Sequence, residues 1–445
     1  MPPTPPGPFT GRSVTDLARD LRAGRTTAAE LARLALDAAV TLDPALGAFV
    51  TVDPVGAAAA PRRAHQELAA GADRGPLHGV PVAVKDLIDV AGLPCTMGSR
   101  HFAGHVAESD AACVTLLRQA GAVIVGKTTT HEFAYGPTGD RSANGPSRNP
   151  RDPGRMSGGS SGGSAAAMAA GMVPLAIGTD TGGSVRIPAA LCGIAGFKPA
   201  YDAIPAAGVF PLSRTFDHVG VLAAGPLDCL IAYRQLATGG PPPARDGAGE
   251  AAVRVGWLDP AVLSPCDPRV VEVARAAAGA GPAEVRLPGE LAEALRETYA
   301  TVQGAEASAV HADRMARAPE LFDPEVLDRL RAAMDLPAWA YVKALDERPA
   351  LAAAAESLFD DHDVLALPAV PLVAPPLEQR QTELDGRAVA VRAALLALTS
   401  PWNVLGLPAL TVPAGSVDGL PVGLQLVCRP GREELLFRVA GSLAG

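Results

Sequence analysis

Lysine is scarce in this sequence, which has four lysines (Lys85, Lys127, Lys198 and Lys343) among 445 residues. Charged residues of all kinds make up only 19% of the chain, whereas 48% of it is hydrophobic. Intrinsic disorder is therefore excluded, because disordered chains are poor in apolar residues and rich in charge. The 38 Lys and Arg residues are outnumbered by 47 Asp and Glu residues, which gives a net charge of −9. A nucleic-acid-binding protein needs a basic face, so we expect no nucleic-acid partner.

The sequence also lacks a cysteine framework and a long apolar run. The six cysteines lie far apart and form no C-x-x-C spacing, so we expect reduced thiols, with no disulfide and no metal site. The N-terminus has neither the basic nor the apolar region of a signal peptide. The longest apolar stretch, Ala165–Gly178, is too short to span a membrane. We expect a soluble, cytoplasmic protein that does not associate with a membrane.

Helical and strand-like patterns alternate along the chain, which predicts an α/β fold in a single elaborated domain. Ser13 begins a helix as an N-cap, and Val80–Val84 and Ala122–Val125 are short apolar runs typical of buried strands. The domain is predicted to comprise N-terminal helices (1–60), a core (61–238), an exposed connection (239–250), a helical region (251–362) and a return to the sheet (363–445).

One short motif fits a phosphate-binding loop but lacks the structural context for it. Gly121–Thr128 matches G-x-x-x-x-G-K-[ST], a loop that must follow its strand. Here the central residues of the motif are themselves the predicted strand. We therefore expect no nucleotide cofactor.

A second short motif fits the nucleophile elbow of serine hydrolases. Gly158–Gly162 matches G-x-S-x-G, which requires a strand directly before it and an acid and a histidine after it. Three histidines do follow, at positions 218, 311 and 362, but the residues before the motif, 149–156, are predicted to form no strand. The elbow is therefore the weaker interpretation of this serine.

A stronger signal comes from three segments taken together. The glycine-serine run Ser157–Ser164 leads directly into an apolar helix and strand, where a flexible linker would serve no purpose. The turn Thr181–Ser184 offers successive backbone N–H groups, which can stabilise a developing oxyanion. Lys85 emerges from the apolar strand 80–84, and burial lowers the pKa of a lysine so that it can act as a base.

These segments resemble the motifs of the amidase signature family. The resemblance rests on Gly79–Asp86, on the run 157–164 and on Gly178–Ser184, and it extends over most of the chain. Ser160 lies 75 residues after Lys85, and Ser184 follows 24 residues later, which fits the Lys–Ser–Ser triad of that family. Smaller matches include Gly126–Thr128, Glu132–Gly136, Asn149-Pro150, Pro401 with Asn403, and Gly419–Gly423. Ser157 departs from the pattern, because family members usually have proline there.

The resemblance implies a catalytic mechanism without a metal or a cofactor. Ser184 would be the nucleophile, Lys85 the terminal base, and Ser160, preceded by a cis peptide bond, the proton relay between them. The implied oxyanion hole consists of the backbone amides of Thr181, Gly182, Gly183 and Ser184. The implied supporting residues, which hold these loops by hydrogen bonds, are Ser161, Asp180 and Arg186. Histidine has no necessary part in this chemistry.

The implied fold is a large mixed sheet flanked by helices, and the implied function is hydrolysis of a small-molecule carboxamide to a carboxylate and an amine or ammonia. One alternative is the glutaminase subunit of a tRNA-dependent amidotransferase. Those relatives carry an acidic residue shortly before the Pro-x-Asn segment, and Ala394–Thr399 contains none. A second alternative is a binding protein with an inactive site, which the complete triad disfavours. A third is an amide-forming acyltransferase that uses the same acyl-enzyme.

The substrate pocket is expected to come from segments that vary within the family. We expect Phe133, Tyr135 and Trp402 to line it, together with the helices of residues 300–345. These segments are mostly apolar, which favours an aliphatic or aryl acyl group. The oligomeric state stays open, and a homodimer is compatible with these expectations.

Overall fold

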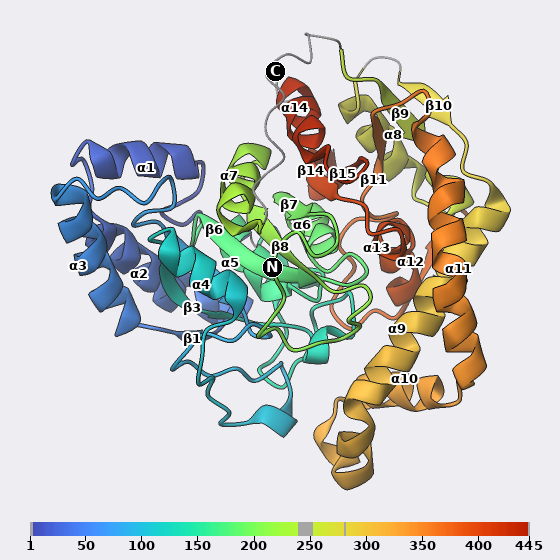
Figure 1. Cartoon of the computed structure of the whole chain (residues 1–445), viewed down its shortest axis with the longest axis horizontal. Coiled ribbons are helices and arrows are strands. Elements are labelled where there is room, and N and C mark those ends of the chain that lie inside the picture. The colour runs from blue at the N-terminus through green and yellow to red at the C-terminus, as the bar shows by residue number, and fades with distance from the viewer. Residues whose placement is uncertain (1–2, 239–251, 280–281, 444–445) are drawn as a thin grey trace.

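An eleven-stranded mixed β-sheet forms the centre of the computed structural model, which describes residues 3–238, 252–279 and 282–443 (Figure 1). The strand order is β1-β3-β2-β6-β8-β7-β14-β15-β11-β9-β10. The strands are β1 (Phe49–Val52), β2 (Pro81–Lys85), β3 (Val123–Thr128), β6 (Leu175–Asp180), β7 (Ala195–Lys198), β8 (His218–Ala223), β9 (Val255–Leu258), β10 (Ala283–Val285), β11 (Val364–Pro368), β14 (Ala409–Val417) and β15 (Leu420–Val427). Outside this sheet, β4 (Arg148–Asn149) pairs with β5 (Asp152–Met156), and β12 (Gln381–Leu384) pairs with β13 (Arg387–Ala390).

Helices cover this sheet and extend beyond it. They are α1 (Val14–Arg22), α2 (Ala28–Leu46), α3 (Gly56–Ala69), α4 (Ala112–Gln119), α5 (Gly162–Ala169), α6 (Arg186–Cys192), α7 (Pro226–Leu236), α8 (Pro268–Ala277), α9 (Gly289–Arg317), α10 (Pro324–Met334), α11 (Ala338–Glu356), α12 (Val391–Ala397), α13 (Ser400–Val404) and α14 (Glu433–Leu443). The short 3-10 helices of the described ranges are η1 (Arg100–Phe102), η2 (Glu132–Ala134), η3 (Pro260–Val262), η4 (Pro319–Leu321) and η5 (Ser357–Phe359). The Ser13 side chain caps α1 by accepting the backbone N–H of Asp16, as the sequence predicted.

The strands β3, β2 and β6 run parallel to one another in the middle of the N-terminal half of the sheet. Every residue of these three strands is buried, because helices lie on both faces of a parallel sheet. Helices α5 and α6 pack against each other and each contacts central strands of the sheet. The carboxyl ends of β2 and β6 therefore lie side by side, next to the start of these two helices.

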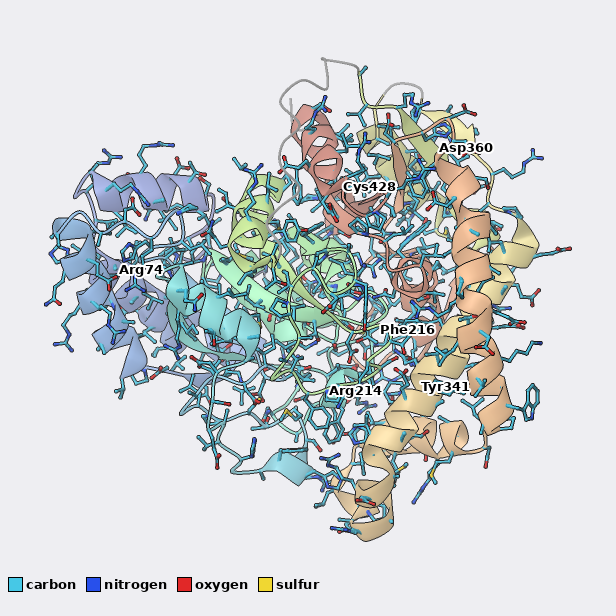
Figure 2. The ribbon with its side chains drawn as sticks, in the orientation of Figure 1. Arg74, Arg214, Phe216, Tyr341, Asp360 and Cys428 are labelled. Atoms are coloured by element: carbon cyan, nitrogen blue, oxygen red, sulfur yellow. The ribbon has the colours of Figure 1, made fainter. Side chains whose placement is uncertain are left out.

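The long helices α9 and α11 and the shorter α10 pack together at the opposite end of the molecule from α1 to α3 (Figure 1). Tyr341 of α11 donates a hydrogen bond to Glu306 of α9 at 3.0 Å, and Figure 2 labels this tyrosine between the two helices. The region 251–362 also supplies the last two strands at one end of the sheet, β9 and the edge strand β10, which the prediction of a helical segment did not include.

Two motif interpretations can be compared directly with the secondary structure. Gly126–Thr128 continue strand β3, so the apparent phosphate loop is part of a strand, as predicted. The prediction that no strand precedes the G-x-S-x-G motif was wrong, because β5 ends at Met156. Its Pro and Gly residues resemble a loop in the sequence, and β5 pairs only with the two-residue strand β4, outside the main sheet. The predicted connection 239–250 lies outside the described residues.

All six cysteines are unpaired and buried in the structure. Among the described residues, no helix is both long and apolar enough to cross a membrane.

Candidate active site

Two neighbouring strands and two helix starts bring the predicted site residues together. Lys85 is the last residue of β2, and Asp180 is the last residue of the adjacent parallel strand β6. Ligand sites in α/β sheets lie beyond such carboxyl ends. Ser160 lies two residues before α5, and Ser184 lies two residues before α6. The three segments singled out in the sequence therefore meet at one edge of the sheet.

Lys85 is fully buried and points its ammonium group at hydroxyls instead of carboxylates. Its Nζ atom lies 2.7 Å from Oγ of Ser160 and 2.6 Å from Oγ1 of Thr179. Burial lowers the pKa of Lys85 to about 7, against an opposing attraction from Asp180 and Asp217. A lysine with this pKa is largely neutral just above pH 7 and can accept a proton.

Asp86, the neighbour of Lys85, has a different partner. Its carboxylate forms a buried ion pair with Lys127, at 3.2 Å from Nζ to Oδ1. The side chain of Asp86 also accepts hydrogen bonds from Thr96. Lys85 is therefore not held by Asp86.

The two serine loops are in direct contact. The backbone N–H of Ser161 donates to the carbonyl of Ser184 at 3.1 Å, and the Ser161 hydroxyl donates to the carbonyl of Thr179 at 3.1 Å. The peptide bond between Gly159 and Ser160 is cis, as the resemblance implied. Ser160 is fully buried, whereas Ser184 retains 5% of its accessible surface. Of the two hydroxyls, that of Ser184 is thus the one nearer to an incoming substrate.

Ser157, where the family usually has proline, is also hydrogen-bonded. Its hydroxyl lies 2.7 Å from that of Ser147 and 3.1 Å from the Ser147 carbonyl. Ser157 is fully buried, so its hydrogen bonds to Ser147 hold the start of the glycine-rich run in place.

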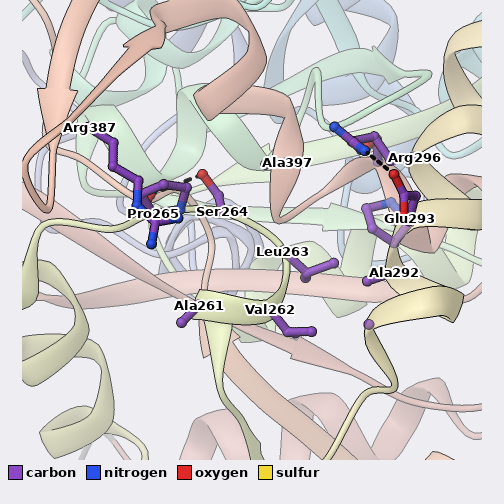
Figure 3. A pocket seen from close by; sticks show the side chains of 13 residues that line it. Ala261, Val262, Leu263, Ser264, Pro265, Ala292, Glu293, Arg296, Arg387 and Ala397 are labelled. Carbon is purple, nitrogen blue, oxygen red and sulfur yellow. Dashed lines mark hydrogen bonds and ion pairs between the residues drawn. The ribbon is translucent and has the colours of Figure 1, made fainter.

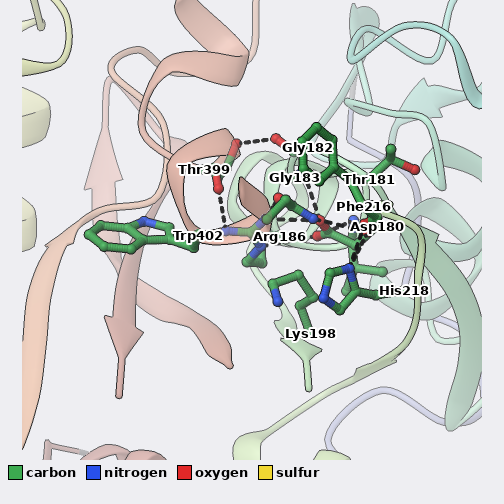
Figure 4. A network of polar contacts seen from close by, with 12 residues as sticks. Asp180, Thr181, Gly182, Gly183, Arg186, Lys198, Phe216, His218, Thr399 and Trp402 are labelled. Atoms are coloured by element: carbon green, nitrogen blue, oxygen red, sulfur yellow. Dashed lines mark hydrogen bonds and ion pairs between the residues drawn. The ribbon is translucent and has the colours of Figure 1, made fainter. Parts of the chain in front are cut away.

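Asp180 is the centre of a buried polar network behind the Thr181–Ser184 turn (Figure 4). Arg186 donates to both of its carboxylate oxygens, at 2.8 and 3.0 Å. Asn403 donates to Oδ1 at 2.9 Å. Burial alone would raise the pKa of Asp180, but the Arg186 guanidinium holds it well below the usual range. Arg186 is itself fully buried and also donates to the side chain of Gln425 at 2.7 Å. The ion pair fixes the start of α6, and with it Ser184.

The backbone of the turn differs from the expected oxyanion hole in one respect. The N–H of Gly183, expected as one of four donors, donates to Oδ1 of Asp180 at 2.8 Å. Within the described chain, the N–H groups of Thr181, Gly182 and Ser184 have no such acceptor. Three of the four amides therefore stay available to a ligand.

Side chains from distant segments hold the turn closely. A Cβ atom on Gly182 would overlap the Tyr299 hydroxyl, and one on Gly183, whose φ is +129°, would overlap the Thr399 side chain. Thr399 also donates its hydroxyl to the carbonyl of Gly182 at 2.6 Å. Only glycine fits at these two positions.

The three predicted pocket residues have different surroundings. Phe133 is fully buried among aromatic side chains, with ring centroids 4.2 Å from His311 and 5.6 Å from Phe322. Tyr135 faces two arginines that the sequence analysis did not single out. Trp402 packs among buried apolar side chains that include Leu398, and its indole N–H donates to the Leu398 carbonyl at 2.9 Å, so it stabilises the fold.

Other residues around the site were missed for a physical reason. Thr179 and Gln425 lie in buried strands. In the sequence, the only sign of a role in the site was a single polar residue within each apolar strand. Tyr299 lies on α9, and nothing in its local sequence indicates that its hydroxyl contacts Gly182.

A surface cavity of about 340 Å³ lies elsewhere, between η3, the start of α9 and the segment 397–401 (Figure 3). None of the predicted catalytic residues lines it. Groups of three or more side chains able to hold a metal ion do not occur in the described ranges.

Comparison with known proteins gives consistent matches over nearly the whole chain. A family model described as Amidase matches residues 30–437. The chain is 34% identical to the AtzE component of 1-carboxybiuret hydrolase from Pseudomonas sp. (strain ADP), over 95% of this chain and 96% of the relative. It is 37% identical to an amidase of Pseudomonas putida, over 97% of this chain and 95% of the relative. A crystal structure of an amidase superposes with a TM-score of 0.89 at 36% identity, covering 97% of this chain and 99% of that one.

Proposed function

Because this chain belongs to the amidase signature family and is a hydrolase of carbon–nitrogen bonds, we propose that it cleaves a small-molecule carboxamide through an acyl-enzyme on Ser184. The products are a carboxylate and an amine or ammonia. The proposed catalytic residues are Lys85, Ser160 and Ser184.

The proposed reaction begins with two proton transfers. Neutral Lys85 accepts the hydroxyl proton of Ser160 as Ser160 accepts that of Ser184, whose Oγ forms a bond to the amide carbon. The amides of Thr181, Gly182 and Ser184 are the proposed donors to the oxyanion. When the C–N bond breaks, Ser160 donates a proton to the leaving nitrogen and recovers one from Lys85. Water then attacks the acyl-enzyme, returning its proton through Ser160, and releases the carboxylate.

The observation that carries this proposal is the buried contact of 2.7 Å between Lys85 and Ser160. Within the described residues, Lys85 forms no ion pair with a carboxylate, so burial can lower its pKa to about 7. A strand-end lysine kept charged for stability would have an acidic partner, as Lys127 has in Asp86.

The Ser184→Ala variant tests the nucleophile. We expect hydrolysis of every amide in a substrate panel to be lost while the fold stays intact, and a trapped acyl adduct to map to Ser184 in the wild type by mass spectrometry. Ser164→Ala is the matched control, since it removes another buried hydroxyl, one that contacts Thr128 and lies outside the proposed relay. Near-wild-type activity of Ser184→Ala would overturn the assignment.

The acyl-enzyme could also transfer its acyl group to an amine instead of to water. Adding hydroxylamine to the assay separates the two fates, because the ratio of hydroxamate to carboxylate measures how the intermediate partitions. The reference is the ratio of hydroxamate to carboxylate that hydroxylamine and water give with the same acyl group in solution, without the enzyme. An enzymatic ratio many times larger than this reference would make acyl transfer the main activity.

A further inference from the structure

The carboxylate of Asp217 bonds to the turn that is proposed to hold the oxyanion, although the proposed reaction does not involve it. The hydroxyl of Thr181 donates to Oδ1 of Asp217 at 2.6 Å. The strand register explains this contact, since β6 and β8 are antiparallel and Asp180 pairs with His218. Thr181 follows β6 and Asp217 precedes β8, so the same register continued by one residue places them opposite each other.

Asp217 belongs to a loop that is fastened to helix α9. Within the loop, its carboxylate accepts the backbone N–H groups of Leu212 at 3.0 Å and of Ser213 at 3.1 Å. Glu306 of α9 accepts the Ser213 hydroxyl at 2.6 Å and the backbone N–H of Thr215 at 3.1 Å. The carboxylate of Asp217 therefore links the turn, through this loop, to α9.

Thr181 is the first of the proposed oxyanion donors, so the contacts that hold it bear on the reaction. Its N–H group belongs to the peptide unit that carries the Asp180 carbonyl, and Asn403 donates to this carbonyl at 3.1 Å. The bond to Asp217 holds the Thr181 side chain. An oxyanion hole is effective when its donors are oriented before the reaction. Two contacts therefore orient this N–H group, and Asp217 supplies one of them.

Asp217 is also a negative charge near Lys85. Two carboxylates, those of Asp180 and Asp217, attract the protonated form of Lys85. Asp180 is paired with Arg186 at 2.8 Å, whereas Asp217 has no ion-pair partner in the described part of the chain. When Lys85 accepts the proton of Ser160, a positive charge forms in a buried site. A carboxylate that no cation neutralises can stabilise this charge across a short distance.

Asp217 is ionised under the conditions in which Lys85 is neutral. Burial raises the pKa of Asp217 to about 6, the charge of Glu306 acts in the same direction, and hydrogen bonds oppose the rise. Asp217 also lines a cavity of about 260 Å³ between residues 201 and 217. In the described ranges, the titratable groups that interact with it are Lys85, Glu306 and Tyr201. At pH 7 and above, Asp217 therefore carries its charge.

We propose that Asp217 is a positioning residue of the amide-cleaving reaction, which holds Thr181 at the start of the oxyanion turn and places a negative charge near Lys85. This inference rests on the proposed function and adds a residue to it. Both effects act on groups whose charge or contacts change during the reaction, so loss of the carboxylate should lower kcat more than it raises KM. A carboxylate that only stabilised the fold would leave the ionisation of Lys85 unchanged.

The Asp217→Asn variant removes the charge and keeps the size of the side chain. We expect the apparent pKa of its kcat/KM profile to fall by about half a pH unit or more, because protonated Lys85 loses an attraction. At pH 9, where Lys85 is neutral in both proteins, kcat is expected to fall about 10-fold, with KM within about 3-fold of the wild type. The matched control is Asp202→Asn, which removes another carboxylate from the same cavity, at a φ of +60° that Asn tolerates. This control is expected to keep both values.

Variants of Thr181 separate the two effects of Asp217. Thr181→Val removes the hydroxyl, keeps the shape of the side chain and leaves the charge of Asp217 in place. We therefore expect kcat to fall while the apparent pKa stays close to that of the wild type. Thr181→Ser keeps the hydroxyl and should retain several times the kcat of Thr181→Val. Circular dichroism checks that each variant is folded.

A measurement without substrate separates this inference from the proposed function. The chain contains four lysines, so ¹³C labelling of lysine gives an NMR spectrum with few signals, and Lys85→Ala identifies the signal of Lys85. We expect the titration midpoint of this signal to be lower in Asp217→Asn than in the wild type by about half a pH unit or more.

The outcomes distinguish the two proposals. If the Lys85 midpoint is unchanged in Asp217→Asn, or if both Asp217→Asn and Thr181→Val keep the kcat of the wild type, this inference is wrong and the amidase proposal stands. If the wild type hydrolyses no amide but the Lys85 midpoint is lower in Asp217→Asn, the interaction between these two residues stands and the amidase proposal falls.

Discussion

Lys85 can accept a proton from Ser160 only when it is neutral, so activity should follow its ionisation. With the pKa lowered from 10.5 to about 7, about 90% of Lys85 is neutral at pH 8, compared with about 0.3% of an ordinary lysine. Burial thereby raises the population of the active base about 300-fold. We expect kcat/KM for a neutral amide to rise tenfold per pH unit below pH 7 and to become constant above about pH 8.

Substitution of Lys85 distinguishes a base from a structural cation. Lys85→Arg keeps the positive charge but cannot release its proton, so we expect it to be as inactive as Lys85→Ala. Removing a general base costs roughly 10²- to 10⁴-fold, and an activated ester should lose less than an amide because its leaving group needs no proton. The measurement is kcat/KM for one amide and one ester of the same acyl group, with the exposed Lys343→Arg as the control.

Two results would refute this reasoning. An active Lys85→Arg variant would mean that a permanent charge suffices at this position. A pH profile with an apparent pKa near 10 would mean that Lys85 titrates as it does in water, and the buried contact with Ser160 would then have no catalytic meaning.

Three further outcomes follow from the same geometry. Ser160→Ala should reduce amide hydrolysis nearly as much as Ser184→Ala does while sparing an activated ester, as measured by initial rates on both substrates. Gly182→Ala should reduce kcat by at least about 100-fold, because its Cβ would displace the turn from the Tyr299 hydroxyl; circular dichroism checks that the fold is kept. Because the folded pKa of Lys85 is lowered, the unfolded chain binds one more proton between about pH 7 and 10.5. The contribution of Lys85 to the unfolding free energy should therefore rise by about 1.4 kcal/mol per pH unit in that range, measured as the difference from Lys85→Ala in urea denaturation.

The sequence predicted the residues of the proposed relay because each lies in a locally distinctive segment. Lys85 ends an apolar strand, and the two serines lie among glycines beside the apolar segment 165–177. These signals need no knowledge of the fold, since strand character, glycine content and a rare lysine are visible within a few residues. Parallel pairing of β2 and β6 then brings the segments together.

The supporting contacts could not be predicted, because they join parts of the chain that are far apart. Arg186 bonds to Asn403, 217 residues away, and to Gln425, 239 residues away. The two arginines that face Tyr135, Arg329 and Arg392, lie on short helices where an arginine resembles an ordinary solvated residue. Only the packing of α10 and α12 around Tyr135 makes them neighbours.

The availability of the Gly183 amide depended on geometry in the same way. In the sequence, four successive N–H groups look equivalent. In the fold, Asp180 takes the third of them, because its carboxylate also holds Arg186 and so points back into the turn.

Burial alone does not make a lysine a base, and the other two buried lysines of this chain show why. Lys127 is paired with Asp86 at 3.2 Å, and a carboxylate at that distance favours the charged amine. Lys198 has a pKa well below the ordinary value because of burial, but its Nζ donates to the Pro199 carbonyl at 2.9 Å, and a carbonyl has no proton to give. Lys85 alone of the three contacts hydroxyls, and a neutral amine between them can donate N–H to Thr179 while its lone pair accepts from Ser160. The capacity for catalysis at this site therefore depends on the combination of a dry pocket, no carboxylate partner among the described residues and two hydroxyl neighbours.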